Sequence, residues 1–408
     1  MDLILRNAVI AGEESAGLTD IGIDDGRIAV VQPGLSADGA EIDLGGNLVA
    51  PGFVETHIHL DKSCILDRCH SEEGNLEEAI AQVAAAKQAF TEEDVAERAR
   101  RTLDKCVLQG TTHIRTHVEV DPVIGLRSLI GILPLVKEYE WALDLDVCVF
   151  PQEGLLNNPG TDELMVEGLR MGAKAVGAAP YTDTDPHGQI DRVFEMAREF
   201  DVDIDMHLDF GADPADMDVE YVCQQTQQFG YGGRVAVGHV TKFAALPEAR
   251  FEEIAERLAS AGVAVTVLPS TDLFLMGRDR DHNVVRGVTP AHKLLKLGVN
   301  CSLSSNNVLD PFTPFGDCSL VRMANLYANV CHVGTPEETA DCFEMVTRRS
   351  AKLLRLEGYD VDAGNRADLV VLQAPDRAAA VSELAAPLYG FKHGRQTFIR
   401  EAARLHRP

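Results

Sequence analysis

Two histidines separated by one residue end a strand-like stretch near the start of the chain. The segment VETHIHLDKS covers residues 54–63 and follows the apolar, Gly- and Pro-punctuated run NLVAPGF. Side chains two apart on a strand point to the same face and lie about 6.5–7 Å apart along the backbone. His57 and His59 can therefore converge on one ion, and the spacing suits a divalent metal.

Two further histidines strengthen this interpretation. A His-x-His pair alone is more often two polar residues at a strand end, but His207 and His239 each end a later strand-like run of their own. Three or four imidazoles that meet in one place could hold Zn²⁺, Fe²⁺ or Co²⁺, whose preferences for nitrogen and oxygen ligands overlap. The residues predict one divalent metal ion and leave its identity open.

Eight β-rich runs would position these residues, and they alternate with helix-like stretches. This alternation predicts a parallel sheet covered by helices, and eight such units match a (β/α)₈ TIM barrel. The helix candidates begin near Ser, Thr, Asp or Pro and end at Gly, as in residues 91–110, 161–172 and 247–262. A doubly wound open sheet is the competing layout. The eight runs are residues 49–59, 111–120, 145–154, 173–181, 202–210, 234–242, 263–271 and 299–307.

Polar residues gather near the C-terminal ends of these runs. In a barrel, that is the face where catalytic loops meet, so we expect one site there. The residues at these positions are His57, His59, His117, Glu119, Gln152, Glu153, His207, Asp209, His239, Asn306 and Asn307.

The two ends of the chain differ from the middle. Residues 1–48 contain short alternating strands with turns, and residues 358–408 contain matching pieces such as AGNRADLVVLQAPD. We expect these two parts to pack together as one small β-sandwich satellite. Residues 49–357 would form the barrel.

Composition excludes several classes of function. The 408 residues are 45% hydrophobic, enough for a large core, and no stretch approaches the length of a membrane helix. The nine cysteines are scattered without a C-x-x-C pair, which favours reduced thiols in the cytoplasm. A formal charge of −27 disfavours nucleic acid and anionic membranes as partners. A small, neutral or cationic substrate is the easier expectation.

The order of several motifs resembles that of a known family. VETHIHLD, RTHVEVD, FPQEG, HLD, GHVT and SNNVLDPF are similar to the successive strand-end motifs of the amidohydrolase superfamily. The nearest branch is that of cytosine deaminase and N-isopropylammelide isopropylaminohydrolase, and the likeness extends to the closing GNRADLVVL. The resemblance implies hydrolysis of a C–N bond in a small nitrogen heterocycle or cyclic amide by metal-activated water. It also implies a homo-oligomer.

The resemblance assigns roles to individual residues. His239 corresponds to the histidine that activates or orients the attacking water. Gln152 matches the glutamine that binds the amide edge of the ring, and Phe312 stands where an aromatic residue lies beside the substrate. Asn307 and His117 join the expected substrate-binding residues. The fourth run offers no carboxylated lysine, which implies a single ion. Its implied ligands are His57, His59 and His207.

Two departures from the family pattern affect the chemistry. The last-strand aspartate, a metal ligand and proton acceptor in the family, is Asn306 here. An amide oxygen can ligate a metal, but it cannot accept a proton near neutral pH. Phe210 replaces the glutamate that shuttles a proton to the ring nitrogen. Both losses disfavour cytosine deamination itself.

Another group must then accept the proton. His239 is the preferred base, with Asp209 and Asp310 as alternatives. Asp209 is as suited to capping a loop as to catalysis, and Asp310, before a proline, is more typical of a turn anchor. His117 and Glu119 could contact substrate, or could equally form hydrogen bonds behind the metal histidines.

Three functions remain open from the sequence. The first is the metal-dependent hydrolase described above. The second is a lyase or isomerase that uses the same ion without activating water. The third is a catalytically silent relative that binds a ligand, which Asn306 and Phe210 make reasonable.

Overall fold

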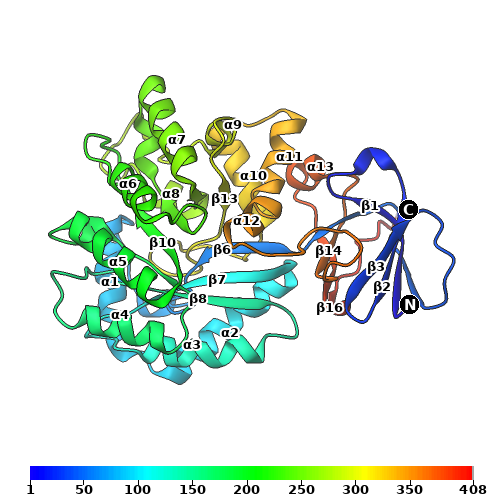
Figure 1. Cartoon of the computed structure of the whole chain (residues 1–408), viewed down its shortest axis with the longest axis horizontal. Helices are drawn as coiled ribbons and strands as arrows, with labels where there is room; N and C mark the ends of the chain where they lie inside the picture. The colour runs from blue at the N-terminus through cyan, green and yellow to red at the C-terminus, as the bar shows by residue number, and fades with distance from the viewer. Residues whose placement is uncertain (407–408) are drawn as a thin grey trace.

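The computed structural model describes residues 1–406, which form a parallel barrel and a second sheet (Figure 1). The barrel strands are hydrogen-bonded in sequence order, as the alternation of runs predicts. They are β6 (Phe53–Ile58), β7 (Thr111–Glu119), β8 (Asp144–Phe150), β9 (Ala175–Val176), β10 (Asp203–Leu208), β11 (Val235–His239), β12 (Val263–Val267) and β13 (Cys301–Leu303).

The first and last of these strands meet and close the sheet. A parallel bridge joins Ile58 to Asn306. Asn306 donates its backbone N–H to the carbonyl of His57 at 3.0 Å, and its own carbonyl accepts from the N–H of His59 at 2.9 Å. The predicted barrel is confirmed, and the open-sheet alternative is wrong.

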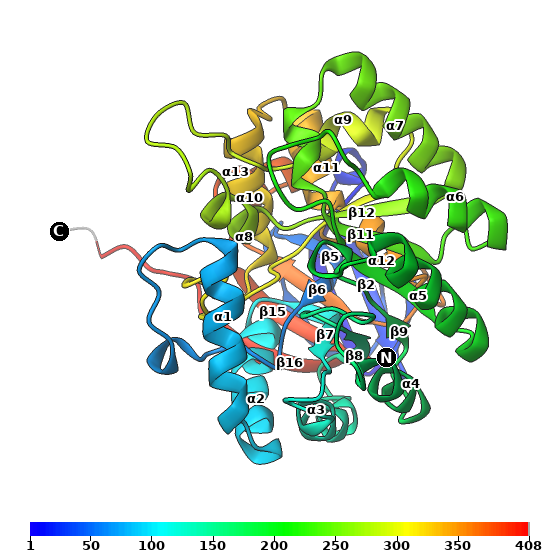
Figure 2. The same cartoon turned by 90° about the vertical axis from the view of Figure 1, so that its left-hand side faces the viewer.

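Helices surround the barrel, and Figure 2 shows them arranged around the central strands. The α-helices are α1 (Leu76–Ala86), α2 (Glu92–Leu108), α3 (Arg127–Glu138), α4 (Thr161–Arg170), α5 (Pro186–Phe200), α6 (Val219–Phe229), α7 (Glu248–Ala261), α8 (Pro269–Leu275), α9 (Ala291–Lys296), α10 (Leu320–Cys331), α11 (Pro336–Glu344), α12 (Arg348–Leu353) and α13 (Arg377–Ser382). Short 3₁₀ helices are η1 (Glu14–Ala16), η2 (Leu66–Arg68), η3 (Lys87–Ala89), η4 (Pro180–Thr182) and η5 (Thr241–Ala245).

Local sequence signals explain where individual elements begin and end. Thr91 caps α2, because its hydroxyl accepts the backbone N–H of Asp94 at 3.2 Å. Gly262 ends α7 with a φ of 70°, a conformation that costs glycine little, and β12 begins at the next residue. All five residues of β12, VAVTV, are buried, as expected for a strand covered by helices on its outer face.

The second sheet is the satellite expected from both chain ends. Its order is β16-β15-β14-β5-β1-β2-β3, with β4 paired to β1. Strands from the two ends share one small core that includes Ile21, Val49, Leu369 and Phe391. The strands are β1 (Leu3–Ile10), β2 (Thr19–Asp24), β3 (Arg27–Gln32), β4 (Ala40–Asp43), β5 (Leu48–Pro51), β14 (Leu369–Leu372), β15 (Pro387–Lys392) and β16 (Arg395–Ile399).

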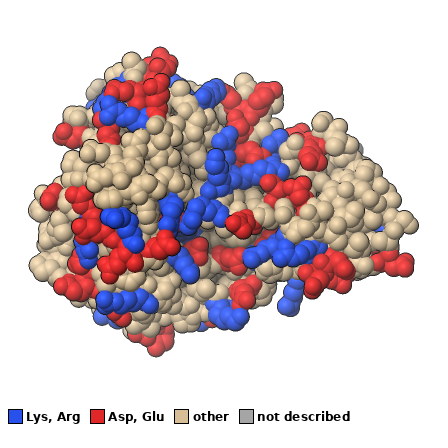
Figure 3. Space-filling view, in the orientation of Figure 1, with Lys and Arg blue, Asp and Glu red and all other residues tan. Residues whose placement is uncertain are grey.

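The satellite contacts the barrel where the barrel strands start. The backbone N–H of Gly52 donates to the carbonyl of Asp368 at 2.9 Å. The ammonium of Lys392 contacts the carboxylates of Asp368 at 2.7 Å and Asp144 at 2.9 Å. Figure 3 shows basic and acidic side chains interspersed along this junction. The C-terminal ends of the strands therefore stay uncovered by the satellite.

Among the described residues, no helix is both long enough and apolar enough to cross a membrane.

Candidate active site

Three histidines from two strands converge inside the barrel near its C-terminal end. The Nε2 atom of His207 lies 3.1 Å from Nε2 of His57 and 3.0 Å from Nε2 of His59. A neutral imidazole has one donor and one acceptor nitrogen, so Nε2 of His207 cannot donate one proton to both neighbours. Nitrogens that share one tetrahedral zinc lie about 3.3 Å apart. The spacing fits a shared cation.

Burial keeps these imidazoles neutral. The three side chains are at most 3% exposed. Burial, helped by the neighbouring His117, lowers the pKa of His57 to about 3. Burial also holds the pKa values of His59 and His207 well below the usual range for histidine. Neutral imidazole is the form that ligates a metal.

His239 belongs to the same cluster. His57, His207 and His239 each offer a nitrogen within 4.8 Å of the other two, and all three side chains are buried. The Nδ1 atom of His239 lies 2.6 Å from a carboxylate oxygen of Asp272, which is fully buried at the start of α8. Asp272 thereby fixes the ring and leaves Nε2 of His239 for the cluster.

Asn306 follows β13 at the closure of the barrel. Its backbone has a φ of 61° and is hydrogen-bonded to the His57–His59 segment on both sides. Its side-chain Oδ1 is buried and has no hydrogen-bond partner among the described residues. A buried acceptor without a donor is costly, and a cation would satisfy it. The neutral histidines and this free oxygen form a donor set that fits a divalent metal.

A second group of residues lies beside the histidines and could hold a substrate. The ammonium of Lys62 donates to Oε1 of Gln152 at 3.2 Å and lies 4.9 Å from the ring centre of Phe312. Lys62 also contacts Glu119 at 3.4 Å. Burial lowers the pKa of His59, and the positive charge of Lys62 lowers it further. Gln152 and Phe312 therefore lie on one side of the site.

Glu119 contacts a second lysine, Lys87, in addition to Lys62. The ammonium of Lys87 contacts carboxylates of Glu119, Asp121 and Glu153, each at 2.5 Å. Three clustered carboxylates are a donor set for a cation, but here the Lys87 ammonium is that cation. The group attaches η3 to β7 and β8, and it orients Glu119 toward Lys62.

Three other sequence-predicted residues serve the framework of the site. The His117 ring stacks on the His57 ring with centres 3.7 Å apart and is completely buried, which favours the role behind the ligands over substrate contact. Asn307 donates its side-chain amide to Asp310 at 2.7 Å. The other carboxylate oxygen of Asp310 accepts the backbone N–H groups of Phe312 and Thr313, so Asp310 anchors this turn.

Asp209 has the capping role. Its two carboxylate oxygens accept the backbone N–H groups of Asp218 and Val219, at 2.9 and 3.0 Å, where α6 begins. Both oxygens therefore already have partners at the start of this helix, which favours the capping role over that of a base. The rings of Phe210 and His239 are nearly perpendicular, with centres 5.3 Å apart. An apolar ring thus borders the proposed base.

Two residues of the site escaped the sequence interpretation. Asp272 stands one residue beyond the seventh strand-like run, and Lys62 lies within the opening HIHLDK segment. Both follow barrel strands, so the rule that polar residues gather after the strands could have found them. Their partners come from other strands, which the sequence does not place.

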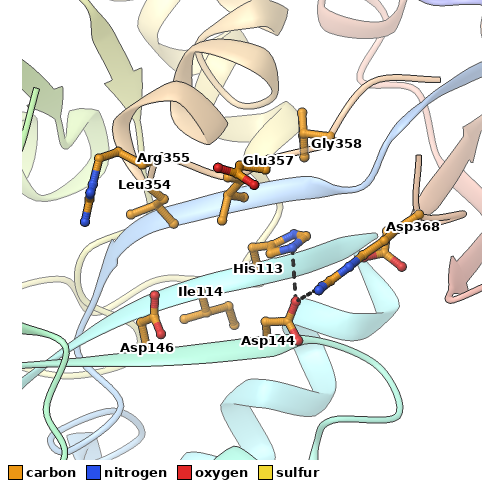
Figure 4. A pocket seen from close by; sticks show the side chains of 12 residues that line it. His113, Ile114, Asp144, Asp146, Leu354, Arg355, Glu357, Gly358 and Asp368 are labelled. Carbon is orange, nitrogen blue, oxygen red and sulfur yellow. Dashed lines mark hydrogen bonds and ion pairs between the residues drawn. The ribbon is translucent and has the colours of Figure 1, made fainter. Parts of the chain in front are cut away.

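A cleft at the opposite end of the barrel is a different kind of site. It has a volume of about 310 Å³ and lies between the barrel and the satellite (Figure 4). His113 contacts Asp144 at 3.1 Å, and Lys392 already bridges Asp144 and Asp368. His113, Asp144 and Asp368 could together ligate a cation. The Lys392 ammonium, however, already compensates the charge of the two carboxylates. They connect the two parts of the chain.

Comparison with known proteins gives a consistent result. The amidohydrolase family model matches residues 40–135 and 137–398. N-isopropylammelide isopropyl amidohydrolase of Pseudomonas sp. (strain ADP) is 30% identical over 97% of this chain and 96% of its own. Pterin deaminase of Rhizobium rhizogenes is 28% identical over 91% of this chain and 88% of its own. The crystal structure of 5-methylcytosine deaminase from Klebsiella pneumoniae has a TM-score of 0.95 and 28% identity over 99% of both chains.

Proposed function

Because the chain belongs to the amidohydrolase family, we propose that it is a metal-dependent hydrolase acting on a non-peptide C–N bond of a small nitrogen heterocycle or cyclic amide. The relatives described above carry names that refer to ammelide, pterin and methylcytosine. The observation that carries the proposal is the meeting of three neutral imidazoles at 3.0 and 3.1 Å.

His57, His59 and His207 would hold one divalent ion, with the free oxygen of Asn306 as a further ligand. The ion, as zinc, iron or cobalt, would supply Lewis-acid activation of the attacking water. The chain's part is to keep the imidazoles neutral and the pocket shielded from solvent. Burial of all four side chains supports this role.

His239 would accept the proton that the water loses as its oxygen adds to the substrate carbon. Asp272 holds Nδ1 of this ring at 2.6 Å and is positioned to stabilise the imidazolium that forms. When the C–N bond breaks, His239 can return that proton to the departing nitrogen. This pair supplies the acid–base function that Asn306 and Phe210 cannot.

Gln152, Lys62 and Phe312 would orient the substrate. The amide of Gln152 suits a ring amide edge, and the phenyl ring of Phe312 offers a flat apolar surface. Lys62 holds Gln152 in place and can itself donate to a ring oxygen. Phe210 offers only a hydrocarbon ring beside the base, so it cannot protonate a ring nitrogen there.

Metal analysis followed by a product assay tests the proposal. The purified full chain is expected to carry one divalent ion and to release ammonia or an amine from at least one pyrimidine, triazine, hydantoin or pterin. Solvent labelled with ¹⁸O should appear in the product, which separates hydrolysis from a lyase or isomerase reaction.

Histidine variants provide the matched control. His207→Ala should lose both metal and turnover, whereas His187→Ala, with a side chain 54% exposed on α5, should keep both. Full activity in metal-free protein or in His207→Ala would contradict the metal-dependent mechanism. Bound metal without turnover on any ring class would support the silent ligand-binding relative instead.

A further inference from the structure

A buried arginine and aspartate lie inside the barrel directly behind the proposed metal ligands. Arg115 on β7 reaches across to β10, where its Nη1 lies 3.3 Å from Oδ2 of Asp205. Both side chains are at most 2% exposed. Barrel interiors are usually filled by branched apolar side chains, so a charged pair at this depth requires an explanation.

The free oxygen of Asp205 faces the histidines. Its Oδ1 lies 3.6 Å from Nδ1 of His57 and 3.4 Å from Nε2 of His117. Among the described residues, neither Oδ1 of Asp205 nor Nδ1 of His57 has a hydrogen-bond partner. The carboxylate oxygen could accept the hydrogen bond that the His57 Nδ1–H could donate. Such bonds are often long before the ligand of a site is bound, and they shorten in the complex.

Nδ1 of His57 is the ring nitrogen that would not bind the metal. His57 directs Nε2 at His207, which leaves Nδ1 on the side of Asp205. Histidine ligands commonly donate their second ring N–H to a carboxylate, which fixes the tautomer and the ring orientation. At His57, the carboxylate of Asp205 lies on the Nδ1 side of the ring, 3.6 Å away.

Stability alone does not account for this pair. Replacing a buried ion pair by apolar residues of similar volume is often neutral or stabilising. Arg115 also contacts Asp203 at 3.1 Å, and Asp203 is paired with Arg234 and Arg355 toward the other end of the barrel. Arg115 therefore has a second anchor, and Asp205 is the member of the network that reaches the histidines.

We infer that Asp205, held by Arg115, is a positioning residue that accepts a hydrogen bond from Nδ1 of His57 and so fixes this ring for metal binding. The inference rests on the proposed metal site, and it concerns metal affinity before turnover. Loss of such a partner typically weakens metal binding about 10–100-fold.

Metal titration of the full-length apoprotein tests this role. Zn²⁺ affinity, measured by competition with a chromogenic chelator, is expected to fall about 10–100-fold in Asp205→Asn. The visible spectrum of bound Co²⁺ should change as well, because the His57 ring would no longer be fixed. Asp203→Asn is the matched control: it shares Arg115 but contacts no metal-binding histidine, so its affinity should stay within about threefold of the wild type.

Several results would overturn the inference. Unchanged Zn²⁺ affinity in Asp205→Asn would do so, as would an equal loss in Asp203→Asn. Two ions in the wild type and one in Asp205→Asn would make Asp205 a ligand of a second metal. If Asp205→Asn does not fold, Arg115→Gln decides: weaker Zn²⁺ binding supports the role, and unchanged binding refutes it. A wild type that binds no divalent metal would refute the proposed function as well.

Discussion

At the scale of single residues, the chemistry of this site depends on which groups can accept a proton. The amide of Asn306 cannot accept a proton near neutral pH, whereas His239 has a carboxylate partner at hydrogen-bond distance. Its contact with Asp272 measures 2.6 Å, and the carboxylate is fully buried. An imidazole oriented in this way is a suitable general base.

Asp272→Asn should separate catalysis from metal binding. The amide keeps the shape but cannot stabilise the imidazolium or enforce the tautomer, so kcat should fall by about 100-fold or more. Metal content should remain that of the wild type. Steady-state kinetics and metal analysis of the same preparation check both points. Asp279→Asn changes an aspartate 77% exposed on the following loop and should alter neither, whereas wild-type kcat in Asp272→Asn would exclude the pair.

Asn306→Asp should strengthen metal retention. A carboxylate replaces a neutral oxygen that is buried without a partner, and anionic oxygen is a better ligand for a divalent cation. The half-time of metal loss to EDTA should lengthen, and the pH dependence of kcat should shift because a second proton acceptor enters the site. Identical metal loss and an identical pH profile would place Asn306 outside the ligand set.

At the scale of elements, the site depends on how the loops after each strand are fixed. Asp209 joins the end of β10 to the start of α6 by accepting two backbone N–H groups. Lys87 attaches η3 to the ends of β7 and β8 through three carboxylates. Charged side chains near the proposed metal ligands can therefore be structural, and their position alone does not make them catalytic.

Asp209→Asn tests this distinction. One of two acceptors is lost at the start of α6, so the free energy of unfolding should fall by about 1 kcal/mol. The value of kcat should stay within about twofold of the wild type. Asp185→Asn is a matched control, because Asp185 caps α5 through Gly188 at 3.0 Å. Urea denaturation and steady-state kinetics measure both variants. A large loss of kcat in Asp209→Asn, but not in Asp185→Asn, would support Asp209 as the base.

At the scale of the whole molecule, the satellite is attached to the end of the barrel opposite the site. Lys392 is fully buried and bridges the carboxylates of Asp144 and Asp368. The first belongs to a barrel strand, and the second precedes a satellite strand. This contact stabilises the junction without entering the proposed catalytic pocket.

Lys392→Met should destabilise the fold by about 3 kcal/mol, because it leaves the buried carboxylate of Asp368 without its counter-charge. Lys137→Met provides the comparison: its side chain is 86% exposed and paired with Glu140, so its removal should cost about 0.5 kcal/mol or less. Urea denaturation at pH 7 measures both. Equal effects of the two substitutions would show that the junction does not depend on this bridge.

The same junction should weaken in acid. Burial alone would raise the pKa of Asp144, but the hydrogen bond from His113 and the charge of Lys392 lower it well below the usual range. A depressed pKa in the folded state gives stability that is complete above the unfolded value, about 4. That contribution is lost as the pH falls below this value. The wild type should therefore lose stability below about pH 4 more steeply than Asp144→Asn, as measured by urea denaturation from pH 3 to 7.

The sequence by itself predicted the barrel, the satellite and the strand ends at which the polar motifs lie. Strand and helix periodicity are local properties, and Gly and capping residues mark the ends of elements, as at Thr91 and Gly262. The family resemblance rested on the same local motifs. The sequence also indicated which polar residues would gather at one end of the barrel, because the ends of parallel strands meet at the same edge.

Only the tertiary structure decided which of those polar residues face one another. His239 and Asp272 come from different strand ends, as do His57 and Asp205, and each pairing depends on how the barrel closes. Asp209 shows the reverse case, since its place beside His207 in the chain suggested a base, whereas the adjoining helix occupies its oxygens. Contacts between distant strands depend on packing and register, which local patterns in one sequence do not specify.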